Sequence, residues 1–253
     1  MKSSFFYLVF FWVLAGENSI AQSTVEVEFL HEKVDDSINP DPGMAAFLKP
    51  FREGVEAFAS EVIGIAAEPL TRRRPEGGLS NLAVDSLRAV SEREFGTAIE
   101  VGVINFGGLR RNMPEGELTM GLLTELSPFD NYLTFLEVEG ELILELAKQI
   151  SGGAGLAVSG MTIRFDEDGE LTKALVGGEP IDLGKRYRMA SIDYLVGTRD
   201  SLFKDEWIVS KIVSEDLVLK DSIVLHLSVL NERGVKIFEE GDGRVGLERH
   251  ESE

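Results

Sequence analysis

The spacing of apolar residues along the chain predicts several helices. Apolar side chains recur at helical spacing over 44–59, 79–90, 141–149 and 217–231, and 119–125 forms a helix or turn. The first of these helices has the longest apolar stripe. We expect the stripe to face the protein core, and it consists of Ala45, Phe47, Leu48, Phe51, Val55 and Phe58.

Shorter apolar or alternating runs predict strands between these helices. Alternation of apolar and polar residues over 24–30 indicates an early strand, and 99–105 is a short apolar strand that runs into Phe106, Gly107 and Gly108. Because strands and helices follow each other irregularly, the pattern favours an α+β fold. The other predicted strands are 62–67, 132–138, 159–166, 171–176 and 187–191.

The N-terminus has the pattern of a secretory signal peptide. Lys2 precedes an apolar run over 5–15, and the small residues Ser19 and Ala21 suit a cleavage site. The apolar run is shorter than the ~20 residues of a permanent membrane helix. We therefore expect residues 1–21 to be removed, no permanent membrane span, one domain over 22–245, and a charged tail over 246–253. The charged segment from Glu239 to Glu253 is expected to be frayed or disordered.

Charge and composition exclude several classes of function. The formal net charge is −19, and such an acidic protein is a poor match for nucleic acid, which is bound through Lys and Arg. The chain has no cysteine, which excludes thiolate catalysis and cysteine-ligated metals. His31, His226 and His250 are far apart in the sequence and follow no metal-ligand spacing. We expect His226 to be a partly buried helix residue.

Glycine-flanked loops after the predicted strands hold the best candidate binding residues. The aromatic residues Phe129 and Tyr194 could hold a planar ligand between their faces. Asn105 and Asp200 could form hydrogen bonds with this ligand, and Arg110 could meet a negative group. Simple turn chemistry explains the same residues, so their types alone leave both interpretations open.

The same loops resemble motifs of the 5'-nucleotidase C-terminal domain. Asn105-Phe-Gly-Gly-Leu-Arg110 is similar to the family's Asn-Gly-Gly-Gly-Ile-Arg loop, and 126–131 (Leu-Ser-Pro-Phe-Asp-Asn) resembles Leu-Pro-Phe-Gly-Asn. Further similar segments occur in the same order. They are 81–85 (Asn-Leu-Ala-Val-Asp), 116–119 (Gly-Glu-Leu-Thr), 158–161 (Val-Ser-Gly-Met), 187–190 (Tyr-Arg-Met-Ala) and 193–195 (Asp-Tyr-Leu).

The resemblance implies a fold and a role for each candidate residue. It implies a mixed sheet with flanking helices that binds the nucleoside part of a nucleotide, while a separate metallophosphoesterase domain holds two metal ions. Phe129 and Tyr194 would stack on the base, and Asp200 would bind the ribose hydroxyls. Asn105 and Arg110 would contact the base or phosphate. The phosphatase motifs (Asp-x-His, Gly-Asn-His-Asp/Glu and Gly-His-x-His) do not occur in this sequence.

Three positions depart from the family pattern. Gly78 stands where the family has an arginine, and the neighbouring Arg72 to Arg74 offer a conjectural replacement. Phe106 replaces a glycine and adds bulk where the backbone should approach the ligand. Thr198-Arg199 and Ser201-Leu202 replace a Gly-Gly and a Gly-Tyr pair on either side of Asp200.

These observations leave three hypotheses. The first is an exported half of a split 5'-nucleotidase, periplasmic or extracellular, which presents a nucleoside monophosphate or nucleoside to a separate phosphatase chain. This chain would then hydrolyse phosphate esters only with that partner, need no cofactor of its own, and expose a docking face. The second is a stand-alone binding or scaffold protein that kept the fold without nucleotidase activity. The third, a self-sufficient hydrolase with an unrecognised site, has the least support.

Overall fold

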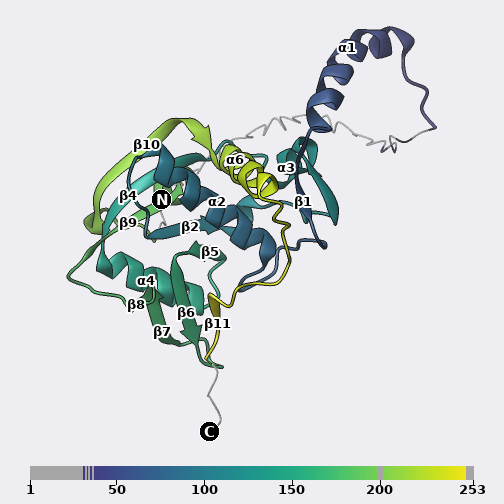
Figure 1. Cartoon of the computed structure of the whole chain (residues 1–253). Helices are drawn as coiled ribbons and strands as arrows, with labels where there is room; N and C mark the ends of the chain where they lie inside the picture. The colour runs from purple at the N-terminus through teal and green to yellow at the C-terminus, as the bar shows by residue number, and fades with distance from the viewer. Residues whose placement is uncertain (1–30, 32, 34, 36, 199–201, 249–253) are drawn as a thin grey trace, which may run out of the picture. The chain divides into compact units, whose positions relative to one another are not determined.

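In the computed structural model, the chain folds into a mixed arrangement of helices and sheets (Figure 1). The structure describes residues 31, 33, 35, 37–198 and 202–248. The predicted signal peptide and the strand expected over 24–30 therefore lie outside the described residues. The chain divides into two units, Met1–Phe47 and Leu48–Glu253, and all sheets described below belong to the second.

Helices form where the apolar spacing predicted them, with ends that shift by a few residues. The 119–125 segment is a helix rather than a turn, and a short helix that the spacing did not predict follows residue 192. The α-helices are α1 (Pro42–Ala59), α2 (Gly78–Glu94), α3 (Met120–Leu126), α4 (Gly140–Ser151), α5 (Asp193–Gly197) and α6 (Leu219–Glu232). The 3-10 turns are η1 (Phe106–Gly108) and η2 (Asp205–Trp207).

A five-stranded sheet in the order β10-β4-β9-β2-β5 forms the centre of the second unit. β2 runs parallel to β9 and the other neighbours are antiparallel, so the sheet is mixed and the predicted fold class is confirmed. Its strands are β2 (Val101–Asn105), β4 (Tyr132–Glu139), β5 (Leu156–Ser159), β9 (Arg186–Ile192) and β10 (Ile208–Val218).

Two smaller sheets complete the second unit. One pairs β1 with β3, and the other has the order β11-β6-β7-β8, in which β11 runs parallel to β6. Their strands are β1 (Val62–Ala66), β3 (Gly116–Thr119), β6 (Met161–Phe165), β7 (Leu171–Val176), β8 (Glu179–Pro180) and β11 (Val245–Leu247).

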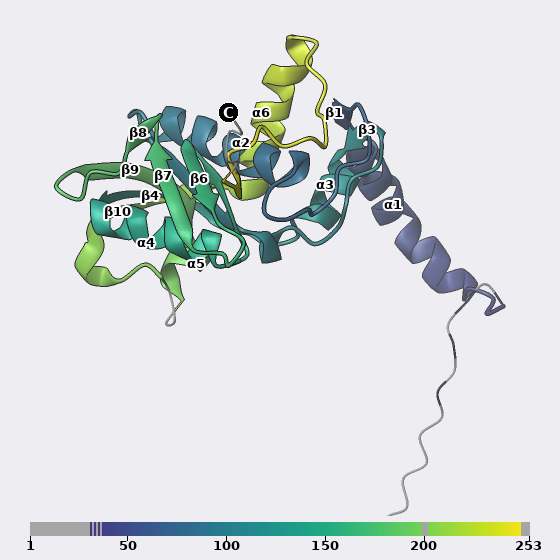
Figure 2. The same cartoon turned by 90° about the horizontal axis from the view of Figure 1, so that it is seen from below.

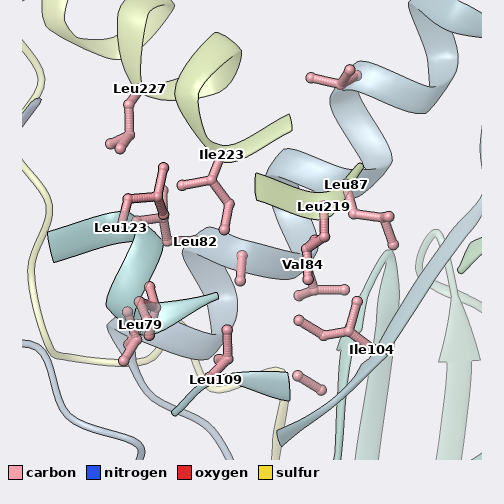
Figure 3. Close-up of a cluster of buried hydrophobic side chains, with 14 of the residues drawn as sticks. Leu79, Leu82, Val84, Leu87, Ile104, Leu109, Leu123, Leu219, Ile223 and Leu227 are labelled. Carbon is pink, nitrogen blue, oxygen red and sulfur yellow. The ribbon is translucent and has the colours of Figure 1, made fainter. Parts of the chain in front are cut away.

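Both faces of the five-stranded sheet are buried because α2 and α4 lie on opposite sides of it (Figure 2). In β2, Ile104 packs with the α2 cluster, whereas Val101 and Val103 pack with the α4 cluster, as alternation along a strand requires. Figure 3 shows the α2 side, where leucines of α2 meet side chains from α3 and α6. A strand buried on both faces explains the continuous apolar run over 101–104.

The expectation that the apolar stripe of α1 faces the core is wrong. No residue of α1 is buried, and Val55 and Phe58 have exposed fractions of 64% and 52%. Met44, Phe47 and Phe51 are exposed as well. Helical spacing shows that a helix is amphipathic, but it does not show what covers the apolar face.

The expectation of a frayed segment from Glu239 onward is wrong for the residues up to Glu248. Residues 237–248, which we call the C-terminal strap, lie along residues 66–85. The Glu239 carboxylate accepts hydrogen bonds from the backbone N–H and the hydroxyl of Thr71, and Gly78 N–H donates to Glu239 O at 2.7 Å. The charges of Glu239, Asp242 and Arg244 are therefore paired within the fold rather than left in solvent.

An arginine anchors the strap on α2. Arg244 forms ion pairs with Asp85 at 2.8 Å and with Asp242 at 2.6 Å, and these carboxylates raise its pKa despite burial. The same contact lowers the pKa of Asp242, chiefly through the hydrogen bond from Arg244. Because a charged guanidinium and carboxylate form the stronger kind of hydrogen bond, this cluster holds the strap in place.

His226 lies in α6, as predicted, and is partly buried. Burial lowers the pKa of its imidazole, since desolvation disfavours the charged form. Among the described residues, no group of three His, Asp or Glu side chains is placed to hold a metal ion. Within residues 37–198 and 202–248, no helix has the length and apolarity of a bilayer-spanning segment.

Candidate nucleoside-binding site

Strand pairing brings three of the predicted binding loops to one edge of the five-stranded sheet. β2 and β9 run parallel with Gly102 opposite Ala190, so their carboxyl ends meet at this edge. β4 begins at the same edge, because its ladder with β9 ends at the pair Leu133–Ile192. Ligands of open α/β sheets bind outside the carboxyl ends of strands. The loops that carry Asn105, Phe129 and Tyr194 are thus gathered where such a ligand would bind.

Asn105 ends β2 with its side-chain carbonyl buried and unbonded. Within the described part of the chain, its Oδ1 has no hydrogen-bond partner. A Cβ added to Gly108 would lie 3.5 Å from Asn105 Oδ1 and 4.0 Å from Asn131 Nδ2, so both amides flank this glycine. A buried acceptor without a partner costs free energy unless something else satisfies it. A ligand N–H or a water at this edge would do so.

Arg110 and Phe129 form a cation–π pair in the loops at this edge of the sheet. The Arg110 guanidinium lies 5.8 Å from the centre of the Phe129 ring, and its Nη1 donates to Gly107 O at 3.3 Å. Arg110 N–H donates to Leu126 O at 2.7 Å, which ties the loop after β2 to the end of α3. Phe129 has an exposed fraction of 46%, so one face of its ring is available for stacking.

Tyr194 lies on α5 and is 58% exposed. Its backbone N–H donates to Asp193 Oδ1 at 2.7 Å, and Tyr132 N–H donates to the same oxygen at 3.0 Å. Tyr132 is three residues after Phe129, so Asp193 connects the segments of both aromatic residues. Asp200, the fifth predicted residue, lies outside the described residues.

The structure places two arginines of the 72–74 run against the loop after β2. Arg72 Nη1 donates to Leu109 O at 3.0 Å, beside Arg110. The Arg74 guanidinium lies 5.3 Å from the centre of the Phe106 ring. Phe106 is only 5% exposed and packs with the α2 core cluster, so its bulk is directed into the protein.

Gly78 cannot be replaced by the arginine found in the family without moving the strap. A Cβ at this position would lie 1.8 Å from Phe238 O and 2.8 Å from the Cα of Glu239. Both are backbone atoms, which cannot rotate away as a side chain can. The path of the C-terminal strap therefore excludes any side chain here, and a cation has to come from another position such as Arg72.

A large hollow in the described part of the second unit lies away from this edge. It has a volume of about 2070 Å³ and lies among residues 73–76, 162–173 and 241–248. Both acidic and basic side chains line this hollow, and none of the predicted site residues is among its lining residues. Small-molecule sites are mostly apolar with a few placed polar groups, which fits the edge at Phe129 and Tyr194 better than this hollow.

The fold is that of a mixed α/β domain, and comparisons with known proteins identify its family. The chain belongs to the family described as "5'-nucleotidase, C-terminal domain", whose model matches residues 59–205. The predicted resemblance is thereby confirmed.

Similar proteins are all much longer than the matched region. Endonuclease YhcR of Bacillus subtilis is 31% identical over 155 residues, which cover 59% of this chain and 12% of that protein. A 5'-nucleotidase of Vibrio parahaemolyticus is 25% identical over 166 residues, 64% of this chain and 29% of that protein. The structure of a 5'-nucleotidase precursor from Thermus thermophilus has a TM-score of 0.66 at 24% identity, covering 83% of this chain and 44% of that one. The chain therefore spans less than half of these relatives.

We expect Arg72 to contribute to the recognition of a phosphate group. A guanidinium has five N–H donors, so Arg72 can hold Leu109 O and still meet an anion. Replacing Arg72 with Gln should weaken AMP binding about threefold, since exposed ion pairs are worth ~0.2–1 kcal/mol, and leave adenosine binding unchanged. Calorimetric titration of both ligands measures this. Arg73→Gln is the matched control, and equal losses for AMP and adenosine would contradict the assignment.

Proposed function

We propose that this chain is the exported nucleotide- or nucleoside-binding half of a 5'-nucleotidase, which acts together with a separate metallophosphoesterase chain. The observation that carries this proposal is the meeting of Asn105, the Arg110–Phe129 pair and Tyr194 at one edge of the sheet. Membership of the 5'-nucleotidase C-terminal domain family supports a nucleotide as the ligand.

The ligand would be held chiefly by stacking. A nucleobase between Phe129 and Tyr194 would bury two exposed aromatic faces, and base–aromatic stacking is worth ~1–3 kcal/mol per base. Asn105 Oδ1 would accept a hydrogen bond from the ligand, and Arg110 with Arg72 would meet the phosphate. By the family resemblance, Asp200 would bind the ribose hydroxyls.

The hydrolytic step would belong to the partner. Cleaving a phosphate ester with two metal ions requires several carboxylate and imidazole ligands around ions ~3.5–4 Å apart. This sequence has three histidines, and His226 lies in α6 beside Asp85 and Arg93 rather than at the binding edge. In this proposal, the chain binds and orients the nucleotide, and the divalent metals are the partner's.

The apolar face of α1 supports a docking role toward that partner. Val55 and Phe58 are exposed on the last turns of the helix, directly before the family match begins at residue 59. In a longer relative, the segment just before the matched region leads in sequence toward the preceding part of the chain. Exposed aromatic and aliphatic side chains grouped on one face are typical of an interaction surface.

Phosphate release from AMP tests the joint action. A separately expressed metallophosphoesterase chain from the same organism is assayed alone and after mixing with the wild-type chain, and we expect several-fold faster release with both. The Val55→Glu variant should lose this enhancement and still bind adenosine, whereas Gly54→Ala on the same helix should keep it. An unchanged rate on mixing would contradict the proposal.

The alternative is a stand-alone binding or scaffold protein. The substitutions at Gly78, Phe106 and Thr198-Arg199 favour it, because they fall at positions where the family contacts its ligand. The burial of Phe106 weakens this argument, since the ring is directed away from the loop surface. Binding of AMP that disappears in the Phe129→Ala variant supports the first function, and absence of any AMP binding supports the alternative.

Export is part of the same proposal. It rests on the signal-peptide pattern of residues 1–21 and gives a periplasmic or extracellular location. N-terminal sequencing of the protein recovered from the culture medium and from the periplasm would test it. A mature N-terminus at Gln22 is the expected result, and an intact Met1 would contradict it.

A further inference from the structure

Asp193 occupies the point where the segments of the two aromatic residues meet. The antiparallel ladder between β4 and β9 ends at Leu133–Ile192, one residue before Tyr132 and Asp193 would pair. At that position the Asp193 side chain replaces the backbone acceptor of the ladder, because its Oδ1 accepts a hydrogen bond from the Tyr132 N–H at 3.0 Å. The same oxygen accepts the Tyr194 N–H at 2.7 Å.

One carboxylate oxygen thus connects two backbone segments that the ladder no longer holds. Tyr132 is three residues from Phe129, and Tyr194 follows Asp193 directly, so the two bonds link the backbone segments that carry the two rings. Hydrogen bonds to an ionised acceptor are about twice as strong as neutral ones. Stacking on both faces of a base requires a fixed gap between the rings, which these bonds can set.

We propose that Asp193 is a positioning residue that fixes the separation of Phe129 and Tyr194 for a planar ligand. This inference rests on the proposed nucleoside-binding function. A side chain that only stabilises the turn would change the stability of the fold without a specific effect on the ligand. A positioning residue changes affinity through the aromatic rings, which a double-mutant cycle detects.

Calorimetric titration with adenosine is the test. We expect Asp193→Ala to weaken binding about tenfold, and Asp193→Asn to stay within about twofold of wild type because the amide oxygen can still accept both N–H groups. Asp193→Ala added to Phe129→Ala should cost almost nothing further. Asp193→Glu tests the same point if the Ala variant is unfolded, since its longer side chain displaces the oxygen and should weaken binding severalfold.

Asp166→Ala is the matched control. The Asp166 Oδ1 also accepts two backbone N–H groups, from Asp168 at 3.0 Å and Glu170 at 2.9 Å, but in the turn between β6 and β7. The Asp166→Ala variant should have a changed melting temperature and an unchanged affinity for adenosine. Wild-type affinity in Asp193→Ala or Asp193→Glu would overturn the inference while the proposed function stands. Absence of adenosine and AMP binding by the wild-type chain would overturn both.

Discussion

Replacing Phe129 with Ala is expected to weaken the binding of both adenosine and AMP about fivefold or more. The Phe129 ring is 46% exposed and paired with Arg110, so it offers one face to a base. Loss of base–aromatic stacking costs ~1–3 kcal/mol, and 1.4 kcal/mol corresponds to a factor of ten. The variant also removes the surface on which the Arg110 guanidinium lies. Calorimetric titration gives both affinities directly.

Two controls separate stacking from a general loss of structure. Tyr194→Phe keeps an aromatic ring at position 194 and should bind adenosine within about twofold of wild type. Phe238→Ala removes another exposed ring that lies in the C-terminal strap, and it should leave both affinities unchanged. Equal binding by wild type and Phe129→Ala would remove Phe129 from the site.

Replacing Gly78 with Ala is expected to destabilise the protein strongly. The added methyl group would lie 1.8 Å from Phe238 O, and Gly78 N–H already donates to Glu239 O at 2.7 Å. The strap has to move away from α2, which should cost ~2–3 kcal/mol or more as an overpacked position. For a domain of about 200 residues, 1 kcal/mol shifts the melting temperature by ~2–4 °C. Thermal unfolding followed by circular dichroism should show a fall of ~4–12 °C.

Gly54→Ala is the matched control for this prediction. A Cβ at Gly54 would have no neighbour within 4 Å, and the residue lies inside α1. Alanine should therefore be neutral or slightly stabilising there, by up to ~1 kcal/mol. A melting temperature of Gly78→Ala equal to that of wild type would show that the strap does not pack on α2 as described.

Much of the fold could be predicted from the sequence, because the spacing of apolar residues within a segment determines whether a helix or a strand can bury them. Helix α2 and strand β2 follow from the spacing of apolar residues that the two core clusters then bury. The edge strand β10 was not predicted. It pairs only with β4 in the sheet and leaves Ile212 and Val213 exposed, so its residues show no clear alternation.

Contacts between distant segments explain what the sequence could not reveal. The charged residues of the C-terminal strap look like a solvated tail until the bonds of Glu239 to Thr71 and of Arg244 to Glu76 and Asp85 are known. The apolar stripe of α1 predicted a buried face, and the spacing alone did not show that Phe58 stays exposed.

The candidate site was predicted through the family motifs rather than through residue types. Turn chemistry explained Asn105, Phe129 and Tyr194 equally well until seven segments in one order pointed to a single family. Arg72 and Asp193 were not predicted as site residues, because their roles depend on bonds to Leu109 O and Tyr132 N–H across long sequence separations. Three consecutive arginines and an aspartate beside Tyr194 were the available signals.

The central claim is that this chain holds a nucleoside between Phe129 and Tyr194, and nuclear Overhauser contacts to adenosine test it most directly. The sequence has only four tyrosines, so selective tyrosine labelling identifies Tyr194 by comparison with Tyr194→Phe. We predict contacts from the adenine H2 and H8 protons to the Tyr194 ring and to the Phe129 ring. The contacts to Phe129 should vanish in Phe129→Ala. Adenosine that binds with contacts to neither ring, or that does not bind at millimolar concentration, would contradict the claim.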